Sequence, residues 1–155
     1  MGGPDGALTP DGALDAIVRG DAPLGCPYPL TDCNTFTCGA TCYMFCPYLQ
    51  VWGDARTQCA LWGGCMATIP SGEISTCLGE VGTGWFGLHQ PIAGPEGPWM
   101  WDCSDTSSFT DWAVGQPDDG LSAIIDEDCG ELRTDGDWND ADCAVGLPFF
   151  CGWTP

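Results

Sequence analysis

The chain has 155 residues, of which 44% are hydrophobic, so its length and composition predict one domain with a substantial core. Three Arg, no Lys and 22 acidic residues give a formal net charge of −19. A surface with this charge repels phosphate backbones and anionic lipid headgroups, which disfavours nucleic-acid and membrane-surface partners. It suits divalent cations such as Ca²⁺, which take hard oxygen ligands.

Cysteine usage indicates an oxidising compartment. Twelve Cys occur with a single His, and no two Cys have the Cys-x-x-Cys spacing that structural zinc sites favour. Reducing compartments keep thiols free, so an even and abundant Cys count predicts disulfides and a secreted, extracellular protein. No stretch is long and apolar enough to cross a bilayer, so we expect no membrane insertion.

Residues 1–25 are rich in Gly, Pro and Asp and differ from the rest of the chain. They contain a tandem repeat, Pro-Asp-Gly-Ala-Leu at 4–8 and again at 10–14. Pro-Asp-Gly is a turn signal, so we expect an N-terminal arm over 1–25 and a folded domain over 26–155. If the arm is ordered, Leu8, Leu14, Ile17 and Val18 are expected to dock on the same chain or on a second copy, the second arrangement giving a homo-oligomer or filament.

The rest of the chain predicts an α+β domain. Five Cys between 26 and 46 indicate a stapled loop and hairpin. Apolar side chains recur at helical spacing within 51–62, at Trp52, Ala55, Cys59 and Trp62. A second helix is expected to begin at its cap, Ser71, and to bury Ile74, Cys77 and Leu78. Short apolar segments at 85–88, 99–101, 138 and 147–150 then predict strands joined by long loops.

Acidic side chains crowd the loop over 114–128, where five of them surround Pro117, namely Asp118, Asp119, Asp126, Glu127 and Asp128. Carboxylates repel one another at close range unless a cation lies among them. A long loop without secondary structure is also typical of a ligand- or metal-ordered segment. The pattern therefore favours a cation site in this loop.

From about Cys38 to Trp153 the chain resembles the C-type lectin-like domains. The resemblance is carried by motifs in the family order: Cys42-Tyr43-Met44-Phe45, Trp52 with Asp54-Ala55 and Cys59, Ala67-Thr68-Ile69, Trp85-Phe86-Gly87-Leu88, Trp112, Gln116-Pro117-Asp118, Glu127-Asp128-Cys129, Trp138-Asn139-Asp140, Cys143 and Phe149-Phe150-Cys151. It implies an α+β fold with two helices, small antiparallel sheets and long calcium-ordered loops.

The resemblance also implies two disulfides, Cys59 with Cys151 and Cys129 with Cys143. Cys42 is expected to pair upstream, with Cys33 or Cys26. The pairing of the other Cys, including Cys46, Cys65, Cys77 and Cys103, is not determined by the sequence.

The principal calcium site of the family, carried over residue by residue, corresponds to Gln116, Asp118, Glu127, Asn139 and Asp140. Carboxylate and amide oxygens on loops are the natural ligands of Ca²⁺. Pro117 resembles the family's cis proline, which aims both neighbouring side chains at the ion. An auxiliary calcium site would use Asp119, Glu127 and Asp128, although the upstream acids of that site are poorly matched in 89–96.

The same five residues are the expected sugar-binding residues. An amide that gives its oxygen to Ca²⁺ keeps its NH₂ to donate to a hydroxyl, whereas a carboxylate accepts from one. In the family, the Gln-Pro-Asp order accompanies a galactose-type preference. The aromatic side chain that usually follows this triplet is missing here, and Trp99 or Trp101 of another loop is the candidate replacement.

These observations favour calcium-dependent binding of glycans or glycoconjugates. The alternative is an extracellular self-assembling, ice-binding or protein-surface-binding protein that uses the same fold without sugar. We do not expect an enzyme, because the single His offers no Ser-His-Asp order and the candidate acids are assigned to the metal. Trp85, Trp112 and Trp138 are expected in the core, His89 in a polar loop, and Glu73, Glu80 and Glu131 on solvated faces.

Overall fold

A computed structural model describes residues 23, 25–91, 97–120 and 125–153. The elements are β1 (Asn34–Cys38), β2 (Thr41–Gln50), α2 (Trp52–Trp62), β3 (Cys65–Met66), α3 (Gly72–Val81), β4 (Gly84–His89), β5 (Met100–Trp101), the 3₁₀ turn η1 (Asp102–Ser104), β6 (Cys129–Leu132), β7 (Trp138–Ala141) and β8 (Leu147–Gly152). The α+β class is confirmed. Nearly all of the expected arm, 1–22 and 24, lies outside the described residues.

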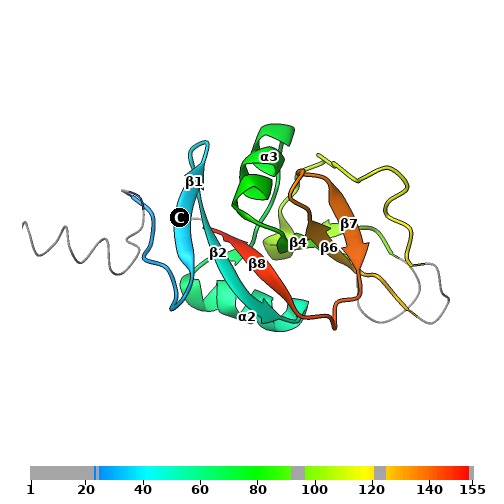
Figure 1. The fold of residues 1–155 in the computed structure, drawn as a ribbon, viewed down its shortest axis with the longest axis horizontal. Coiled ribbons are helices and arrows are strands. Elements are labelled where there is room, and N and C mark those ends of the chain that lie inside the picture. Colours follow the sequence, from blue (N-terminus) through cyan, green and yellow to red (C-terminus); the bar gives the residue numbers. More distant parts are fainter. Residues whose placement is uncertain (1–22, 24, 92–96, 121–124, 154–155) are drawn as a thin grey trace, which may run out of the picture.

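The strands join in one connected sheet in the order β1-β2-β8-β4-β6-β7, with β3 paired to β8 and β5 to β4. The C-terminal strand β8 lies between β2 and β4 (Figure 1), so the end of the chain fills the middle of the sheet. Its pairing with β2 is antiparallel, whereas its pairing with β4, at Trp85 and Phe149, is parallel. The sheet is therefore mixed, although its other strand pairs are antiparallel, as the resemblance implies.

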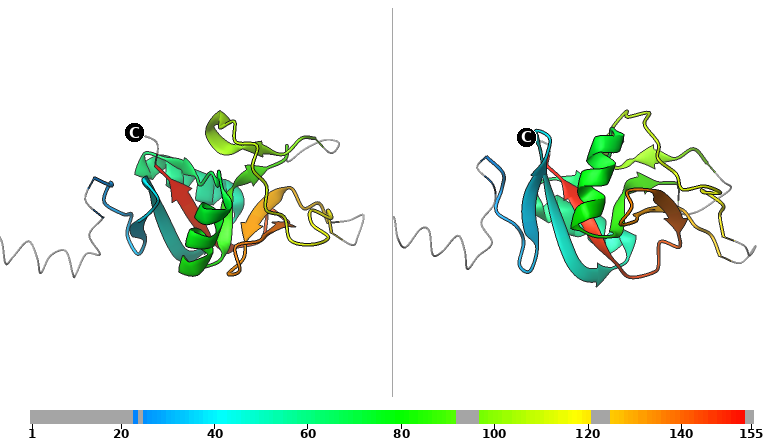
Figure 2. Two further views of the ribbon diagram at one scale, coloured as in Figure 1. Left: turned by 90° about the horizontal axis from the view of Figure 1, so that it is seen from above. Right: turned by 45° about the horizontal axis from the view of Figure 1, so that its top comes forward.

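Helices α2 and α3 lie on opposite sides of β8 (Figures 1 and 2). The apolar face expected for α2 is buried, and the helix ends at Gly63, whose φ of 97° is favourable for glycine. Helix α3 begins as expected, because the Ser71 hydroxyl accepts a hydrogen bond from Ile74 N. Its most buried residues are Ser75, Leu78 and Gly79, while Ile74 and Cys77 are only partly buried.

Tryptophan side chains fill the core and satisfy their indole N–H groups inside it. Trp52 Nε1 donates to Phe86 O, and Trp85 Nε1 donates to Gln50 O, both at 2.9 Å. Trp138 Nε1 donates to Ser75 Oγ at 2.9 Å. A buried indole without such a partner would be destabilising, so these bonds fix the orientation of each ring.

Six disulfides use all twelve cysteines. They are Cys26–Cys42, Cys33–Cys46, Cys38–Cys77, Cys59–Cys151, Cys65–Cys103 and Cys129–Cys143. The two family pairs are present, and Cys42 takes Cys26 rather than Cys33. Because cross-links restrict the unfolded chain, each typically contributes about 2–4 kcal/mol to stability.

Two expectations from the sequence are corrected at β4 and β6. His89 is the last residue of β4, and its ring packs on Trp52 with centroids 4.6 Å apart. Burial lowers the pKa of His89 below its usual value. Glu131 is partly buried in β6 and pairs with Asn139, so it is not simply a solvated side chain.

Among the described residues, no helix has the length and apolar character needed to cross a membrane.

Candidate calcium and ligand site

The β6–β7 hairpin carries half of the candidate site. The two strands pair in antiparallel register, with Gly130 opposite Asp140 and Glu131 opposite Asn139. The disulfide Cys129–Cys143 closes the open end of this hairpin. Glu127, which precedes β6, therefore approaches the end of β7 at which Asp140 lies, at the end of the molecule far from β1 (Figure 1).

The Gln-Pro-Asp segment is brought to the hairpin by a short parallel bridge between Trp112 and Trp138. Ala113 N donates to Trp138 O at 2.9 Å, and Gln116 N then donates back to Ala113 O at 2.9 Å. The turn so formed places residues 116–118 beside Asn139 and Asp140. The Gln116–Pro117 peptide bond is cis.

Asp140 is the centre of the hydrogen bonding in this loop. Asp140 is only 1% exposed. Its carboxylate accepts hydrogen bonds from Asp118 N at 3.1 Å and from Asp119 N at 2.7 Å. A buried carboxylate needs such donors, so the loop is built around this group. Asp119 Oδ1 in turn accepts from Glu127 N at 3.1 Å, which ties the two halves of the site together.

Three carboxylates converge at this point. One oxygen from each of Asp118, Glu127 and Asp140 lies within 4.8 Å of the other two. Burial raises the pKa of the Glu127 carboxyl, and the charges of Asp140 and Asp118 raise it further. The second of these causes is the negative charge of the cluster, which a divalent cation would offset.

The Gln116 amide completes the cluster. One of its two terminal atoms lies 3.0 Å from Asn139 Oδ1 and 3.2 Å from Asp118 Oδ1, and it also contacts Asp140 Oδ1. A carbonyl oxygen at this position faces only other oxygen acceptors, an arrangement suited to a cation, whereas an amide nitrogen there donates to all three. The donor set therefore fits Ca²⁺, which takes six to eight oxygens in irregular geometry.

Asn139 is oriented by a residue that the sequence reasoning did not include. Its Nδ2 donates to Glu131 Oε1 at 3.1 Å and to Asp140 O at 2.7 Å, which leaves Oδ1 directed at Gln116. Glu131 thus orients the amide of Asn139, a proposed ligand. The alternation of β6 could have indicated this role only if the register between 131 and 139 had been known.

The auxiliary ligands and the replacement aromatics are arranged differently. Neither Asp119 nor Asp128 belongs to the converging group of described carboxylates, and Asp128 is 5% exposed. Trp101 is buried in the core, where its Nε1 donates to Ser107 O at 2.9 Å, so it does not reach the site. Trp99 is partly buried and packs on Trp112 with centroids 4.9 Å apart.

Comparison of the sequence with known proteins identifies its family. A family model described as the lectin C-type domain matches residues 49–153. Asialoglycoprotein receptor 1 of Rattus norvegicus is 34% identical over 119 residues, covering 72% of this chain and 40% of that protein. C-type mannose receptor 2 of Homo sapiens is 28% identical over 142 residues, covering 84% of this chain and 9% of that protein.

The fold of solved structures agrees. The mouse scavenger receptor C-type lectin carbohydrate-recognition domain is 27% identical, with a TM-score of 0.68, and the match covers 83% of this chain and 97% of that chain. The chain spans well under half the length of the curated relatives named above, since it matches 40% of one and 9% of the other.

Proposed function

Since this chain belongs to the C-type lectin domain family, we propose that its loop site holds Ca²⁺ and, through it, binds the hydroxyl groups of a carbohydrate. The observation that carries the proposal is the convergence of Asp118, Glu127 and Asp140 within 4.8 Å, capped by the Gln116 amide. The proposed ligands and sugar-binding residues are Gln116, Asp118, Glu127, Asn139 and Asp140. These residues would hold the ion, which would leave coordination positions for sugar hydroxyls, since Ca²⁺ takes six to eight oxygens.

The amide of Gln116 links the ion to the sugar. The terminal amide atom that faces Asn139, Asp118 and Asp140 would be the oxygen if Ca²⁺ were bound, and the NH₂ would then point away from the carboxylates. The outward NH₂ donates to a sugar hydroxyl, and Asp118 accepts from the neighbouring one. This order of donor and acceptor supports a galactose-type preference. The relative named as an asialoglycoprotein receptor is consistent with a glycoconjugate as partner.

We also propose an extracellular location for the protein. Six disulfides suit an oxidising, extracellular environment, so we infer that the chain is secreted and meets glycoconjugates there. The net charge of −19 disfavours nucleic acid as a partner. Association into an oligomer or filament through residues 1–25 remains our prediction, to be tested by deleting residues 2–20 and measuring the mass by light scattering.

A glycan array tests the proposal directly. The protein is applied in calcium and again in EDTA, and we expect binding to galactose-terminated glycans that disappears with the chelator. Asp140→Asn, which keeps the shape but removes one ligand charge, is expected to lose binding. Asp126→Asn is the matched control, because Asp126 is an exposed acid of the same loop outside the converging group.

The outcomes separate the alternatives. An array without calcium-dependent signal contradicts the carbohydrate proposal, and the extracellular assembly, ice-binding or protein-surface role then becomes the better hypothesis. If sugar binds, exchanging Gln116→Glu together with Asp118→Asn should shift preference toward mannose-type diols, since it reverses donor and acceptor at constant charge. Unchanged selectivity would mean that these two residues do not contact the sugar.

A further inference from the structure

A cavity lies away from the calcium loops. It has a volume of about 270 Å³ and is formed by the start of β2, by β3, by the residues after β8 and by η1. Tyr43 and Trp153 are among its lining residues. None of the five proposed calcium ligands, all within the described part of the chain, lines it. Its size is slightly below the range of drug-sized ligand sites, so it suits a small molecule.

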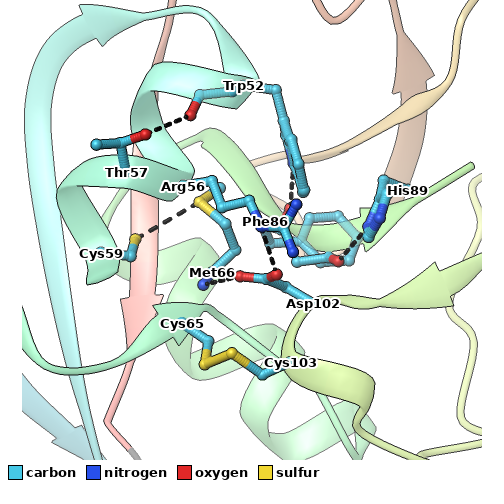
Figure 3. Close-up of polar contacts among 12 residues, drawn as sticks. Trp52, Arg56, Thr57, Cys59, Cys65, Met66, Phe86, His89, Asp102 and Cys103 are labelled. Atoms are coloured by element: carbon cyan, nitrogen blue, oxygen red, sulfur yellow. Dashed lines mark hydrogen bonds and ion pairs between the residues drawn. A yellow bond between two sulfur atoms is a disulfide. The ribbon is translucent and has the colours of Figure 1, made fainter. Parts of the chain in front are cut away.

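One wall of this cavity, η1, is fixed to the body of the domain at three points (Figure 3). The disulfide Cys65–Cys103 joins it to β3. Asp102 Oδ2 accepts a hydrogen bond from Met66 N at 2.9 Å. Asp102 Oδ1 pairs with Arg56 Nε at 2.8 Å. Asp102 is only 3% exposed, so this wall is held by a buried carboxylate with defined partners.

The backbone of η1 is also unusual. Cys103 and Ser104 have φ values of 56° and 59°, which lie in the left-handed region that side chains other than glycine rarely adopt. Each such residue costs roughly 1 kcal/mol or more and persists only where its surroundings impose it. The disulfide and the Asp102 contacts impose it here. The conformation of this cavity wall is therefore imposed by its covalent and polar contacts with the rest of the domain.

The polar lining of the cavity is rich in acceptors. Asp105 contributes an exposed carboxylate, whereas the Asp102 carboxylate is already paired with Arg56 and Met66 N; among the described residues no Lys, Arg or His lines the cavity. The Tyr43 hydroxyl donates to Thr68 O at 3.2 Å and has a hydrogen bond with the Thr41 side chain, so its oxygen keeps one lone pair to accept from a ligand. Burial raises the pKa of Tyr43 to about 12, and the charge of Asp105 adds to the rise. A ligand that donates hydrogen bonds and carries positive charge matches this lining.

The remaining lining is apolar. Met66, Pro70 and Trp153 contribute hydrophobic surface, and the Trp153 ring is partly buried. Aromatic faces favour both flat apolar groups and cations. We propose that this cavity is a second, calcium-independent binding site for small organic cations that carry a primary ammonium on an apolar ring. The ammonium lies at Asp105 and the Tyr43 hydroxyl, and the ring lies against Met66 and Trp153.

The probe for this site is 2-phenylethylamine, titrated into the full chain in EDTA and followed by ¹H–¹⁵N NMR. We expect saturable shifts at the Trp153 indole and at Thr68. The neutral 2-phenylethanol has the same ring and length, and we expect it to bind at least about tenfold more weakly, because it lacks the charge. The anion 3-phenylpropionate should not bind, since the site and the whole chain are negative.

Two variants separate this site from general attraction to an acidic surface. Asp105→Asn removes one charge at the cavity, and the fold should persist because Asp105 is exposed. The affinity for the amine should fall about fivefold. Glu80→Gln removes an exposed charge from α3 and should leave affinity unchanged. Equal affinities of amine and alcohol, or equal effects of the two variants, would overturn the proposal. Because the titration is done without calcium, its result is independent of the glycan array.

Discussion

The Ser75 hydroxyl connects α3 to the hairpin that carries the calcium site. Ser75 is fully buried, and its Oγ donates to Gly136 O at 2.6 Å while accepting from Trp138 Nε1 at 2.9 Å. Trp138 directly precedes Asn139, one of the proposed ligands. Ser75→Ala removes both bonds and leaves a buried indole N–H and a buried carbonyl without their partner.

The cost follows from these contacts. Two lost hydrogen bonds and two groups left unsatisfied give a loss of about 3 kcal/mol. The higher helix propensity of Ala returns roughly 0.5 kcal/mol, so we expect a net loss of about 2.5 kcal/mol in the free energy of unfolding. For a domain of this size, that corresponds to a decrease in Tm of roughly 5–10 °C.

Chemical denaturation with the disulfides intact, followed by Trp fluorescence, measures this loss. Thr76→Ala is the matched control, because Thr76 is the next residue of α3 and is exposed. We expect the control to change stability by less than about 0.5 kcal/mol. A loss of less than 1 kcal/mol for Ser75→Ala relative to Thr76→Ala would refute the reasoning, since it would mean that the two bonds contribute almost nothing or that water replaces the hydroxyl.

Three further predictions follow from the site and the core. Calcium at one hundred times its dissociation constant should stabilise the fold by about 2.7 kcal/mol, seen as a rise in Tm, and Asp140→Ala should abolish the rise. Because burial raises the pKa of Tyr43 to about 12, stability present below pH 10 should fall by roughly 2 kcal/mol as the pH rises to 12. Tyr43→Phe should remove most of this dependence in urea titrations, and the raised pKa of Tyr48 should account for what is left. Gly79→Ala should destabilise, because the new Cβ would lie 3.0 Å from Arg133 O, whereas Gly53→Ala, which meets nothing within 4 Å, should stabilise by up to about 1 kcal/mol in the same denaturation assay.

Local patterns along the chain were sufficient for the helices. The spacing of Trp52, Ala55, Cys59 and Trp62 predicts α2, and each of these side chains is buried. Ser71 predicts the start of α3, and its hydroxyl caps the helix. Both signals act between residues a few positions apart, so they are readable without the tertiary structure.

The candidate ligands came from the resemblance, since acidic crowding alone does not specify which carboxylates meet. Asp118 and Glu127 belong to one loop and Asp140 to a later strand, and only the bridge from Trp112 to Trp138 and the β6–β7 register bring their oxygens within 4.8 Å. Glu131 was assigned to solvent for the same reason, because its contact with Asn139 exists only across paired strands.

What the sequence by itself determined is the class of the domain, its disulfide-rich and acidic character, the two helices and the motifs of the lectin family. The tertiary structure decided the mixed sheet, the partners of Cys65 and Cys77, the position of His89 at the end of β4, and the cavity beside η1. The physical reason is the range of the interactions. Helix periodicity and capping are local, whereas strand register and disulfide pairing depend on which distant segments pack together, and packing is a property of the whole chain.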